Sequence, residues 1–302
     1  MNQQGKLIIT GANGFTGRHA CAHFLKSGFD ITAVSRKKLN IEGKIHAESC
    51  DLTNGNDVNN LIKRTKPQYL LHLAGQNHVG ESWLEPVSTL EANTMSTAYL
   101  IDALRKQSPA CKIVIVGSAL QIDPISISSI PHPYSLSKTL QVLIAKSWAV
   151  LYNMDIIIAK PSNLIGPGLS NGVCSILAKK IAEMEKMGTE TVLEVDNPNV
   201  QRDFLDVRDA VRAYDLLLRR GQSGETYDVA SGTNRSLEDI IEGYRTVTTG
   251  EIKVNSQRND LIENKMAINP IKLVNLGWKP SIPLESSLMD ILAFHRELKE
   301  KC

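Results

Sequence analysis

Five short stretches in the first 160 residues are almost wholly apolar and rich in valine, isoleucine and leucine. They are KLIIT (6–10), DITAV (30–34), YLLHLA (69–74), KIVIVG (112–117) and MDIIIAK (154–160). A strand covered on both faces has this composition, whereas a strand with one wet face alternates apolar and polar residues. The pattern therefore predicts five strands that are buried on both sides.

The segments between these stretches are long enough for helices and have amphipathic spacing, as in GRHACAHFLKSG (17–28) and SLSKTLQVLIAKSWAVLY (135–152). Strands that alternate with helices form right-handed βαβ units and hence a parallel sheet. We therefore expect an α/β protein with a Rossmann-type, doubly wound parallel sheet. After residue 161 the alternation becomes less regular, which indicates a second, smaller α/β domain. The expected boundaries give the first domain residues 1–161 and 206–230, and the second domain residues 162–205 and 231–302.

Charge and cysteine content narrow the choice of partners. The chain of 302 residues has 34 Lys and Arg against 32 Asp and Glu, a net charge of +2, so no broad basic surface is expected for nucleic acid or an anionic membrane. The five cysteines stand singly, without metal-binding or redox spacing, which is typical of reduced thiols in a cytosol. The apolar run 141–160 contains Lys146 and Asp155, and the polar first residues do not form a signal peptide. We therefore expect a cytoplasmic protein with no metal, nucleic-acid or membrane partner.

The first predicted strand runs into the glycine-rich sequence TGANGFTGRHA, in which Gly11, Gly14 and Gly17 stand at every third position. A glycine turn between a buried strand and a helix is typical of dinucleotide-binding proteins. Gly11 would form the tight turn, Gly14 would let the backbone approach a pyrophosphate, and Gly17 would let the helix pack closely on the strand. With Phe15 and Thr16, these are the expected phosphate-binding residues at the helix N-terminus. The alternative is a glycine-rich turn without a ligand.

The end of the second predicted strand indicates which dinucleotide binds. An NAD site usually has a carboxylate here, which holds the ribose 2′-hydroxyl. This chain has AVSRKK instead, so Arg36 follows Ser35 and no acid is near it in the sequence. A guanidinium can hold a 2′-phosphate through two hydrogen bonds, so we expect NADP. The alternative is that Arg36 is a solvated loop residue.

A tyrosine and a lysine stand four positions apart in HPYSLSKTL (132–140), at Tyr134 and Lys138. On a helix this spacing places both side chains on one face. The pair alone does not distinguish a solvated helix face from a proton donor with its activating cation.

Several motifs in the chain bear on this choice. They are TGANGFTG (10–17), CDLT (50–53), HLAG (72–75), and Ser118 with Tyr134 and Lys138. Together they resemble the extended short-chain dehydrogenase/reductase superfamily, the NAD-dependent epimerase/dehydratase family of nucleotide-sugar enzymes. Longer segments are similar to its GDP-6-deoxy-4-keto-mannose reductases and their dehydratase relatives. These segments are 72–105, NLIGPG (163–168), QRDFLDVRDAVRAYDLLL (201–218), YDVASG (227–232) and LGWKP (276–280). The resemblance covers nearly the whole chain.

The resemblance implies a set of binding residues in each domain. The first domain would bind NADP and the second a nucleotide sugar. Expected cofactor contacts, besides the glycine turn, Arg36, Tyr134 and Lys138, are Asp51, Leu52, Leu73, Ala74, Gly75, Asn93, Pro161 and Ser162. Expected substrate contacts are Asn77, Ser118, Asn163, Val173, Arg202 and Arg258. The alternative for the two arginines is ordinary surface charge.

The resemblance also implies a catalytic trio of Ser118, Tyr134 and Lys138. Tyr134 would donate a proton to a carbonyl oxygen, and Ser118 would hold that oxygen by a hydrogen bond. A free tyrosine has a pKa of about 10, so we expect the nearby Lys138 cation to lower the pKa of Tyr134. Lys138 would also hold the nicotinamide ribose.

Two departures from the family pattern bear on the reaction. Related dehydratases carry an acid directly after the catalytic serine or threonine, whereas Ala119 and Leu120 follow Ser118. Elimination of water is therefore not expected, and ketone reduction remains. The loop 119–133 is shorter than is usual for the family, and Lys160 stands where relatives often have arginine. Both features bear on which sugar the enzyme accepts.

We therefore expect an NADPH-dependent reductase of a nucleotide-linked 4-keto-6-deoxy sugar, with GDP as the favoured nucleotide and dTDP, UDP and CDP left open. A second hypothesis is an NAD-dependent nucleotide-sugar 4-epimerase, and a third is a non-catalytic NADP(H)-binding sensor. The resemblance further implies a homodimer, built from the helical segments 89–106 and 135–152 across a two-fold axis.

Overall fold

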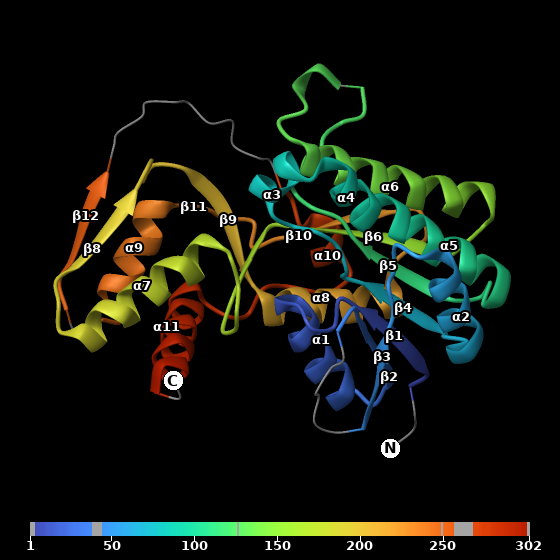
Figure 1. The fold of residues 1–302 in the computed structure, drawn as a ribbon, viewed down its shortest axis with the longest axis horizontal. Helices are drawn as coiled ribbons and strands as arrows, with labels where there is room; N and C mark the ends of the chain where they lie inside the picture. Colours follow the sequence, from blue (N-terminus) through green and yellow to red (C-terminus); the bar gives the residue numbers. More distant parts are fainter. Residues whose placement is uncertain (1–3, 38–43, 126, 249, 257–267, 301–302) are drawn as a thin grey trace. The chain divides into compact units, whose positions relative to one another are not determined.

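The computed structural model describes residues 4–37, 44–125, 127–248, 250–256 and 268–300. The chain divides into two compact units (Figure 1). The first unit comprises Met1–Pro161 and Val211–Tyr227, and the second comprises Ser162–Ala210 and Asp228–Cys302.

A seven-stranded sheet forms the middle layer of the first unit, in the order β10-β6-β5-β4-β1-β2-β3. The strands are β1 (Lys6–Thr10), β2 (Asp30–Ser35), β3 (Ile45–Ser49), β4 (Tyr69–His72), β5 (Lys112–Val116), β6 (Ile156–Pro161) and β10 (Thr226–Val229). The pairs from β6 through β3 are all parallel. This sheet confirms the predicted fold class, and its strand order reverses beside β1, which is where ligands bind in open parallel sheets.

The sequence pattern identified five of these strands and missed β3 and β10. The strand β3 has the sequence IHAES and lies at the sheet edge, where none of its residues is fully buried. A half-exposed edge strand does not need a continuous apolar run, so the composition of β3 does not distinguish it from a loop. β10 has only four residues and alternates half-buried with buried positions.

Helices cover both faces of the first unit's sheet. The helices of this unit are α1 (Phe15–Lys26), α2 (Gly55–Thr65), α3 (Val79–Leu84), α4 (Pro86–Leu90), the π-helical turn η1 (Glu91–Met95), α5 (Ser96–Gln107), the 3-10 turn η2 (Ile127–Ser129) and α6 (Pro133–Leu151). Ile8 and Leu70 share one apolar core with Leu61 of α2 and Leu100 of α5. α1 packs on the other face of β1 and β2 (Figure 1). α8 (Val207–Arg220) continues from the second unit into the first.

The second unit holds two small sheets and several helices. A three-stranded sheet has the order β11-β9-β7, and β12 pairs with β8. Its elements are β7 (Asn163–Ile165), α7 (Val173–Met187), β8 (Thr191–Val195), β9 (Gln201–Asp206), β11 (Asn234–Ser236), α9 (Leu237–Arg245), β12 (Ile252–Ser256), α10 (Ile271–Asn275) and α11 (Leu284–Glu300). Ile165 and Phe204 of the sheet pack with Leu177 of α7, Ile240 of α9 and Leu288 of α11 in one core.

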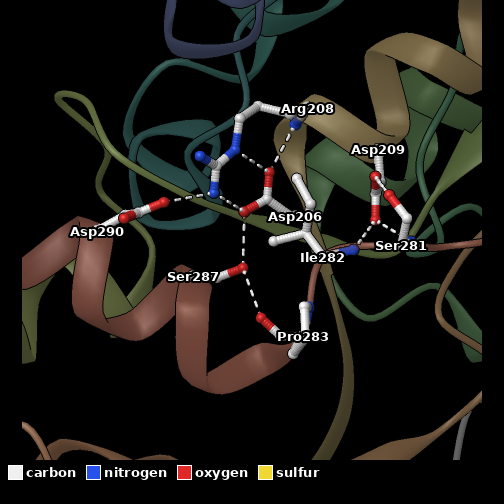
Figure 2. A network of polar contacts seen from close by, with 8 residues as sticks. All are labelled: Asp206, Arg208, Asp209, Ser281, Ile282, Pro283, Ser287 and Asp290. Carbon is white, nitrogen blue, oxygen red and sulfur yellow. Dashed lines mark hydrogen bonds and ion pairs between the residues drawn. The ribbon is translucent and has the colours of Figure 1, made fainter.

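A network of carboxylates connects the start of α8 with the start of α11, as Figure 2 shows. The buried Asp206 accepts hydrogen bonds from Arg208 Nε at 2.9 Å and from Ser287 Oγ at 2.6 Å. Burial alone would raise the pKa of Asp206, but these hydrogen bonds hold it below its usual value. Asp209 accepts from the backbone and hydroxyl of Ser281 at 2.7 and 3.1 Å. The network therefore positions the segment that precedes α11.

Among the residues that the structure describes, no helix has the length and apolarity needed to cross a membrane.

Candidate active site

The glycine turn after β1 is shaped by contacts within the first unit. Gly11 has φ +69°, and a Cβ atom there would lie 2.8 Å from the backbone nitrogen of Ala74. A Cβ on Gly17 would lie 2.1 Å from the carbonyl oxygen of Gly11. Both positions therefore require glycine. At Gly14 a Cβ would meet one atom, the oxygen of Gly11 at 3.2 Å, so the protein itself leaves room beside Gly14.

Gly14 is also the N-cap of α1, and no side chain caps this helix. The first turn, which contains Phe15 and Thr16, has no acidic residue. A helix N-terminus with backbone N–H groups directed outward and no competing carboxylate suits a phosphate. The turn thus has the features that a dinucleotide pyrophosphate needs.

The residues after β4 adjoin this turn, because β4 is the parallel neighbour of β1. Leu73 and Ala74 are half-buried, and the backbone N–H of Ala74 donates to Thr10 Oγ1 at 3.2 Å. A Cβ on Gly75 would lie 2.5 Å from Asn93 Oδ1. Glycine at this position therefore allows the side chain of Asn93 to reach the loop.

Two further predicted cofactor residues lie after β5 and β6. Pro161 is the last residue of β6, and its carbonyl accepts from the backbone N–H of Ala119 at 3.0 Å. The hydroxyl of Ser162 is buried and has no hydrogen-bond partner within the described part of the chain. A buried polar atom without a partner is costly unless a ligand or water satisfies it. Ser162, like the glycine turn, thus fits a nicotinamide dinucleotide.

Arg36 lies directly after β2 and is exposed. The pKa of Asp51 is lowered by hydrogen bonds from the Thr53 side chain and backbone and, to a smaller extent, by the charge of Arg36. Asp51 is therefore close to Arg36 in space, although no acid is near Arg36 in the sequence. The parallel pairing of Ser35 with Ser49 places the end of β3 next to the end of β2. Asp51 is exposed, and Leu52, which follows it, is buried.

Asn93 lies in the π-helical turn η1 and joins the loop after β4 to α6. Its side chain accepts from the backbone N–H of Gln76 at 2.8 Å and donates to the Gln76 carbonyl at 2.9 Å. It also donates to Ser137 Oγ at 2.8 Å. Asn93 is completely buried, so these three hydrogen bonds hold the loop and the helix in a defined arrangement.

The predicted catalytic residues come together at the carboxyl end of β5. Ser118 is the second residue after β5, and Tyr134 is the second residue of α6. The side chain of Ser118 lies close enough to that of Tyr134 to lower its pKa. The backbone N–H of Tyr134 donates to Ser82 Oγ at 3.1 Å, and His132 caps the helix by accepting from the backbone of Ser135. These two hydrogen bonds hold the start of α6 in place.

Burial dominates the electrostatics of this trio. Tyr134 and Lys138 are each 6% exposed. Burial raises the pKa of Tyr134, and the hydrogen bond with Ser118 opposes this effect. Burial lowers the pKa of Lys138 to about 7. Lys138 Nζ donates to the carbonyl oxygen of Val116 at 2.8 Å.

The expectation that Lys138 lowers the pKa of Tyr134 was wrong for the protein as this structure shows it. The pKa of Tyr134 is raised, and the charge of Lys138 is not among its causes. The sequence argument counted the attraction of a cation for a phenolate but not the cost of burying the phenolate. The phenol is therefore protonated at neutral pH, as a proton donor must be, while its raised pKa makes it a weaker acid than a free tyrosine.

Sequence reasoning missed His72, which is completely buried at the end of β4. Its Nδ1 lies 2.7 Å from Thr10 Oγ1, and its Nε2 lies 2.9 Å from Thr97 Oγ1. Burial and the charge of Lys138 lower the pKa of His72 to about 3, so the imidazole is neutral. The signal was a single polar residue within the apolar run YLLHLA. His72 connects β1, which leads to the glycine turn, with α5.

The loop between Ser118 and Tyr134 is anchored at its start. Ser135 Oγ donates to the carbonyl of Leu120 at 2.6 Å, and the backbone N–H of Ile122 donates to Thr139 Oγ1 at 3.0 Å. Farther along, Ile125 is 91% exposed. The first four residues after Ser118 are therefore fixed on α6, and the exposed portion begins beyond them.

The predicted substrate residues divide between the two units. In the first unit, Asn77 is exposed after β4 and Ser118 is half-buried after β5. In the second unit, Asn163 begins β7 and donates to the carbonyl of Asp203 at 3.0 Å. Val173 begins α7 and is 36% exposed.

Arg202 lies on β9 and shares a face of the three-stranded sheet with Asn163. The register pairs Asn163 with Phe204, and alternate residues of a strand point to the same side. The structure thus brings Asn163 and Arg202 to one face. Arg258 lies outside the described residues.

The carboxyl ends of the parallel strands carry a glycine turn, a Ser–Tyr contact and a buried lysine. Together these features define a nicotinamide-dependent enzyme of the Rossmann type. Residues 7–230 match the NAD dependent epimerase/dehydratase family. The chain belongs to this family, which confirms the resemblance seen in its motifs.

A curated protein and a solved structure, both from Pseudomonas aeruginosa, are similar over almost the whole chain. GDP-6-deoxy-D-mannose reductase is 29% identical over 303 residues, which cover 95% of this chain and 96% of the relative. The structure of RMD complexed with NADPH has a TM-score of 0.84 at 26% identity, and the match covers 98% of this chain and 100% of that chain.

Another solved structure is similar in fold alone. UDP-glucose 4-epimerase from Thermus thermophilus, in complex with NAD, has a TM-score of 0.82 at 20% identity. The match covers 96% of this chain and 99% of that chain.

Proposed function

We propose that this protein reduces the C4 ketone of a nucleotide-linked 4-keto-6-deoxy sugar with NADPH. The observation that carries the proposal is the closeness of the Ser118 and Tyr134 side chains, with the buried Lys138 one helical turn after Tyr134. The similarity to a GDP-6-deoxy-D-mannose reductase supports the choice of substrate. A non-catalytic sensor would not need this trio.

In this proposal Tyr134 is the general acid. Its hydroxyl is protonated at neutral pH, and the proton passes to the carbonyl oxygen as that oxygen gains negative charge. Ser118 holds the same oxygen by hydrogen bond. Lys138 anchors the nicotinamide ribose.

The cofactor would be held by the first unit. The glycine turn receives the pyrophosphate, Arg36 receives the 2′-phosphate, and Asp51 and Leu52 lie beside the adenine. Leu73, Ala74 and Gly75 contact the cofactor at the carboxyl end of β4, and Pro161 borders the nicotinamide. Bound NADPH supplies the hydride that reduces the ketone carbon.

Reduction is favoured over dehydration because no acid follows Ser118. The next residues are Ala119 and Leu120, and the backbone N–H of Leu120 donates to Ser118 Oγ at 3.1 Å. The serine hydroxyl is thus oriented by the backbone, and no carboxylate stands in this turn to remove the proton that elimination requires.

The test is NADPH oxidation with a panel of 4-keto-6-deoxy sugars linked to GDP, dTDP, UDP and CDP. We expect turnover with the GDP-linked sugar and formation of the 4-hydroxy product. No NADPH oxidation with any member of the panel would contradict the proposed function.

A 4-epimerase that works through tightly held NAD is the second candidate. The observation that favours it is the closeness of Asp51 to Arg36, because a carboxylate near the ribose is a feature of NAD sites. Interconversion of 4-epimeric nucleotide sugars without added cofactor would identify this activity, and NAD would then be found in the purified protein.

Arg36→Gln is expected to remove the preference for NADPH over NADH. A charge-assisted contact contributes about 1.5–3 kcal/mol, so NADPH affinity should fall by roughly 10- to 100-fold while NADH affinity changes little. Fluorescence titration of both cofactors measures this. Arg64→Gln is the matched control, because Arg64 is exposed and pairs with Glu48 at 3.1 Å. NADH binding as tight as NADPH binding in the unaltered protein would rule out the role of Arg36.

The protein is expected to be a homodimer in solution. Met95 of η1 and Leu143 of α6 are 40% and 38% exposed, and α6 contacts both η1 and α5. An apolar surface on neighbouring helices suits an isologous contact with a second copy. Light scattering at micromolar concentration should give twice the chain mass, and Leu143→Glu should lower it. A monomer mass for the unaltered protein would be the contrary result.

A further inference from the structure

The first turn of α6, which carries Tyr134, takes its hydrogen-bond acceptors from outside the helix. The N–H groups of a helix's first turn have no partner within the helix itself. Pro133, the first helical residue, has no N–H. The N–H of Tyr134 donates to Ser82 Oγ at 3.1 Å, and the N–H of Ser135 donates to His132 Nδ1 at 3.0 Å. The turn therefore depends on the imidazole of His132 for one of its two acceptors.

The hydrogen bond from Ser135 fixes the protonation state of His132. A backbone N–H can only donate, so Nδ1 must accept and carries no proton. The imidazole is therefore neutral, with its proton on Nε2. Protonation would add a hydrogen to Nδ1, in front of the N–H of Ser135, and the hydrogen bond would be lost. Because Ser135 is completely buried, its N–H would then be left without an acceptor, which destabilises the turn.

The environment of His132 also disfavours its charged form. The N-terminus of a helix carries a partial positive charge, so an imidazolium at the N-cap is repelled. Burial lowers the pKa of His132 below its ordinary value of 6.5, and its own backbone carbonyl opposes this effect. The residue is half-buried, so protons from solvent reach it. His132 is thus neutral at neutral pH and becomes charged in mild acid.

The charged groups around α6 do not cause this shift. The titratable groups of the neighbouring elements and of the preceding loop are His78, Glu81, Glu85, Glu91, Asp123 and Lys160, besides Tyr134, Lys138 and Lys146 of α6 itself. The charged residues of α5 lie toward the other end of α6, where Arg105 stacks on the ring of Tyr152 at 4.7 Å. None of these groups is among the causes of the lowered pKa of His132.

We propose that His132 is a positioning residue of the enzyme: its neutral imidazole holds the start of α6, and with it Tyr134, in the arrangement that transfers the proton, and protonation of the imidazole releases this turn. The inference rests on the proposed function. The imidazole also lies against Tyr134, with ring centroids 5.9 Å apart, so its movement reaches the donor directly. A small displacement of a proton donor lowers the rate strongly.

This role predicts a loss of rate in acid that Tyr134 itself does not produce. The raised pKa of Tyr134 means that its phenol is already protonated at neutral pH, so further acid adds no proton to the donor and removes none. Lys138, with a pKa of about 7, gains its charge as the pH falls, which does not weaken its hold on an electron-rich ribose oxygen. A decrease in rate below pH 6.5 therefore points to His132.

The pH profile of single-turnover reduction by the enzyme–NADPH complex, between about pH 5 and pH 8, tests the proposal. The rate of the unaltered enzyme should fall by about tenfold or more as the pH drops below 6.5. His132→Asn should keep a level rate, because the asparagine oxygen accepts from Ser135 at every pH. His132→Ala has no acceptor and should be slow throughout. His46→Asn, at an exposed histidine of β3, is the matched control and should retain the acid loss.

Hydrogen exchange at the amide of Ser135, followed by NMR, reports the cap without turnover. Its protection, corrected for the intrinsic pH dependence of exchange, should fall below pH 6.5 in the unaltered protein and persist in His132→Asn. NADPH binding at each pH shows whether a variant is folded.

Other results would separate this inference from the proposed function. The same acid loss of rate in His132→Asn as in the unaltered enzyme would overturn the role of His132 and leave the reductase proposal standing. Protection of the Ser135 amide that does not change with pH would also overturn it. If no 4-keto sugar were reduced, the proposed function and the positioning role would both be wrong, whatever the exchange at Ser135.

Discussion

Tyr134→Phe is expected to lower turnover of the correct 4-keto sugar by ~10²–10⁴, the usual contribution of a positioned general acid. The substitution retains the ring and its packing and removes only the phenolic hydroxyl, which lies close to Ser118. Affinity for NADPH should change little, because the phenol acts on the substrate carbonyl. Single-turnover reduction, measured by rapid mixing of the enzyme–NADPH complex with substrate, reports the chemical step directly.

Tyr152→Phe is the matched control for this experiment. Tyr152 follows α6 at its far end and is 47% exposed, so loss of its hydroxyl should leave the rate unchanged. Ser118→Ala should cost about 10²-fold, the effect of one lost contact to the developing oxyanion. Reduction by Tyr134→Phe at the unaltered rate would exclude Tyr134 as the proton donor, whatever the substrate proves to be.

Lys138→Met is expected to reduce turnover by a similar factor and also to weaken NADPH binding. Lys138 is proposed to hold the nicotinamide ribose and thereby to position the hydride donor against the ketone, so its loss affects both cofactor binding and the chemical step. Parallel measurements of single-turnover rate and NADPH affinity separate the two effects. Lys146→Met is the control, because Lys146 is an exposed lysine of the same helix. A Lys138→Met variant that loses activity but binds NADPH normally would contradict the ribose role.

The pH dependence of stability tests whether the pKa of Lys138 is lowered in the folded protein. The pKa of Lys138 is about 7 in the folded protein, against an ordinary value of about 10.5. Between these values the unfolded chain binds more protons, so this residue lowers the free energy of unfolding as pH falls from about 10 to about 7. Methionine removes the effect. The melting temperature of Lys138→Met, relative to the unaltered protein, should therefore rise as the pH falls through the same range. A constant difference would show that the pKa of Lys138 is not lowered in the folded protein.

The sequence predicted the sheet best where local composition reflects burial. β1, β2, β4, β5 and β6 are covered on both faces and consist of apolar runs, so each was visible without any knowledge of its neighbours. β3 was missed because an edge strand is only partly covered. The glycine turn was visible for a related reason: backbone conformation and close approach restrict those positions to glycine, and this restriction is written in the residues themselves.

Candidate site residues were predicted by motif, but their interactions were not. Ser118, Tyr134 and Lys138 were identified together, whereas the direction of the pKa shift on Tyr134 was not. Desolvation depends on how many atoms surround a group, and spacing along the chain does not contain that information. His72 was missed because its two threonine partners lie 62 and 25 positions away in the sequence.

The sequence by itself determined the class of this protein: a parallel sheet with a glycine turn after its first strand and a tyrosine and lysine one helical turn apart. These features are local, and each is specified by residues that are near one another in the chain. The tertiary structure decided which charges face each other. It placed Asp51 near Arg36 through the pairing of β2 with β3, and it set Arg235 opposite Arg202 through the register of β9 with β11. Strand register depends on contacts between distant segments, so these juxtapositions exist only in the folded chain.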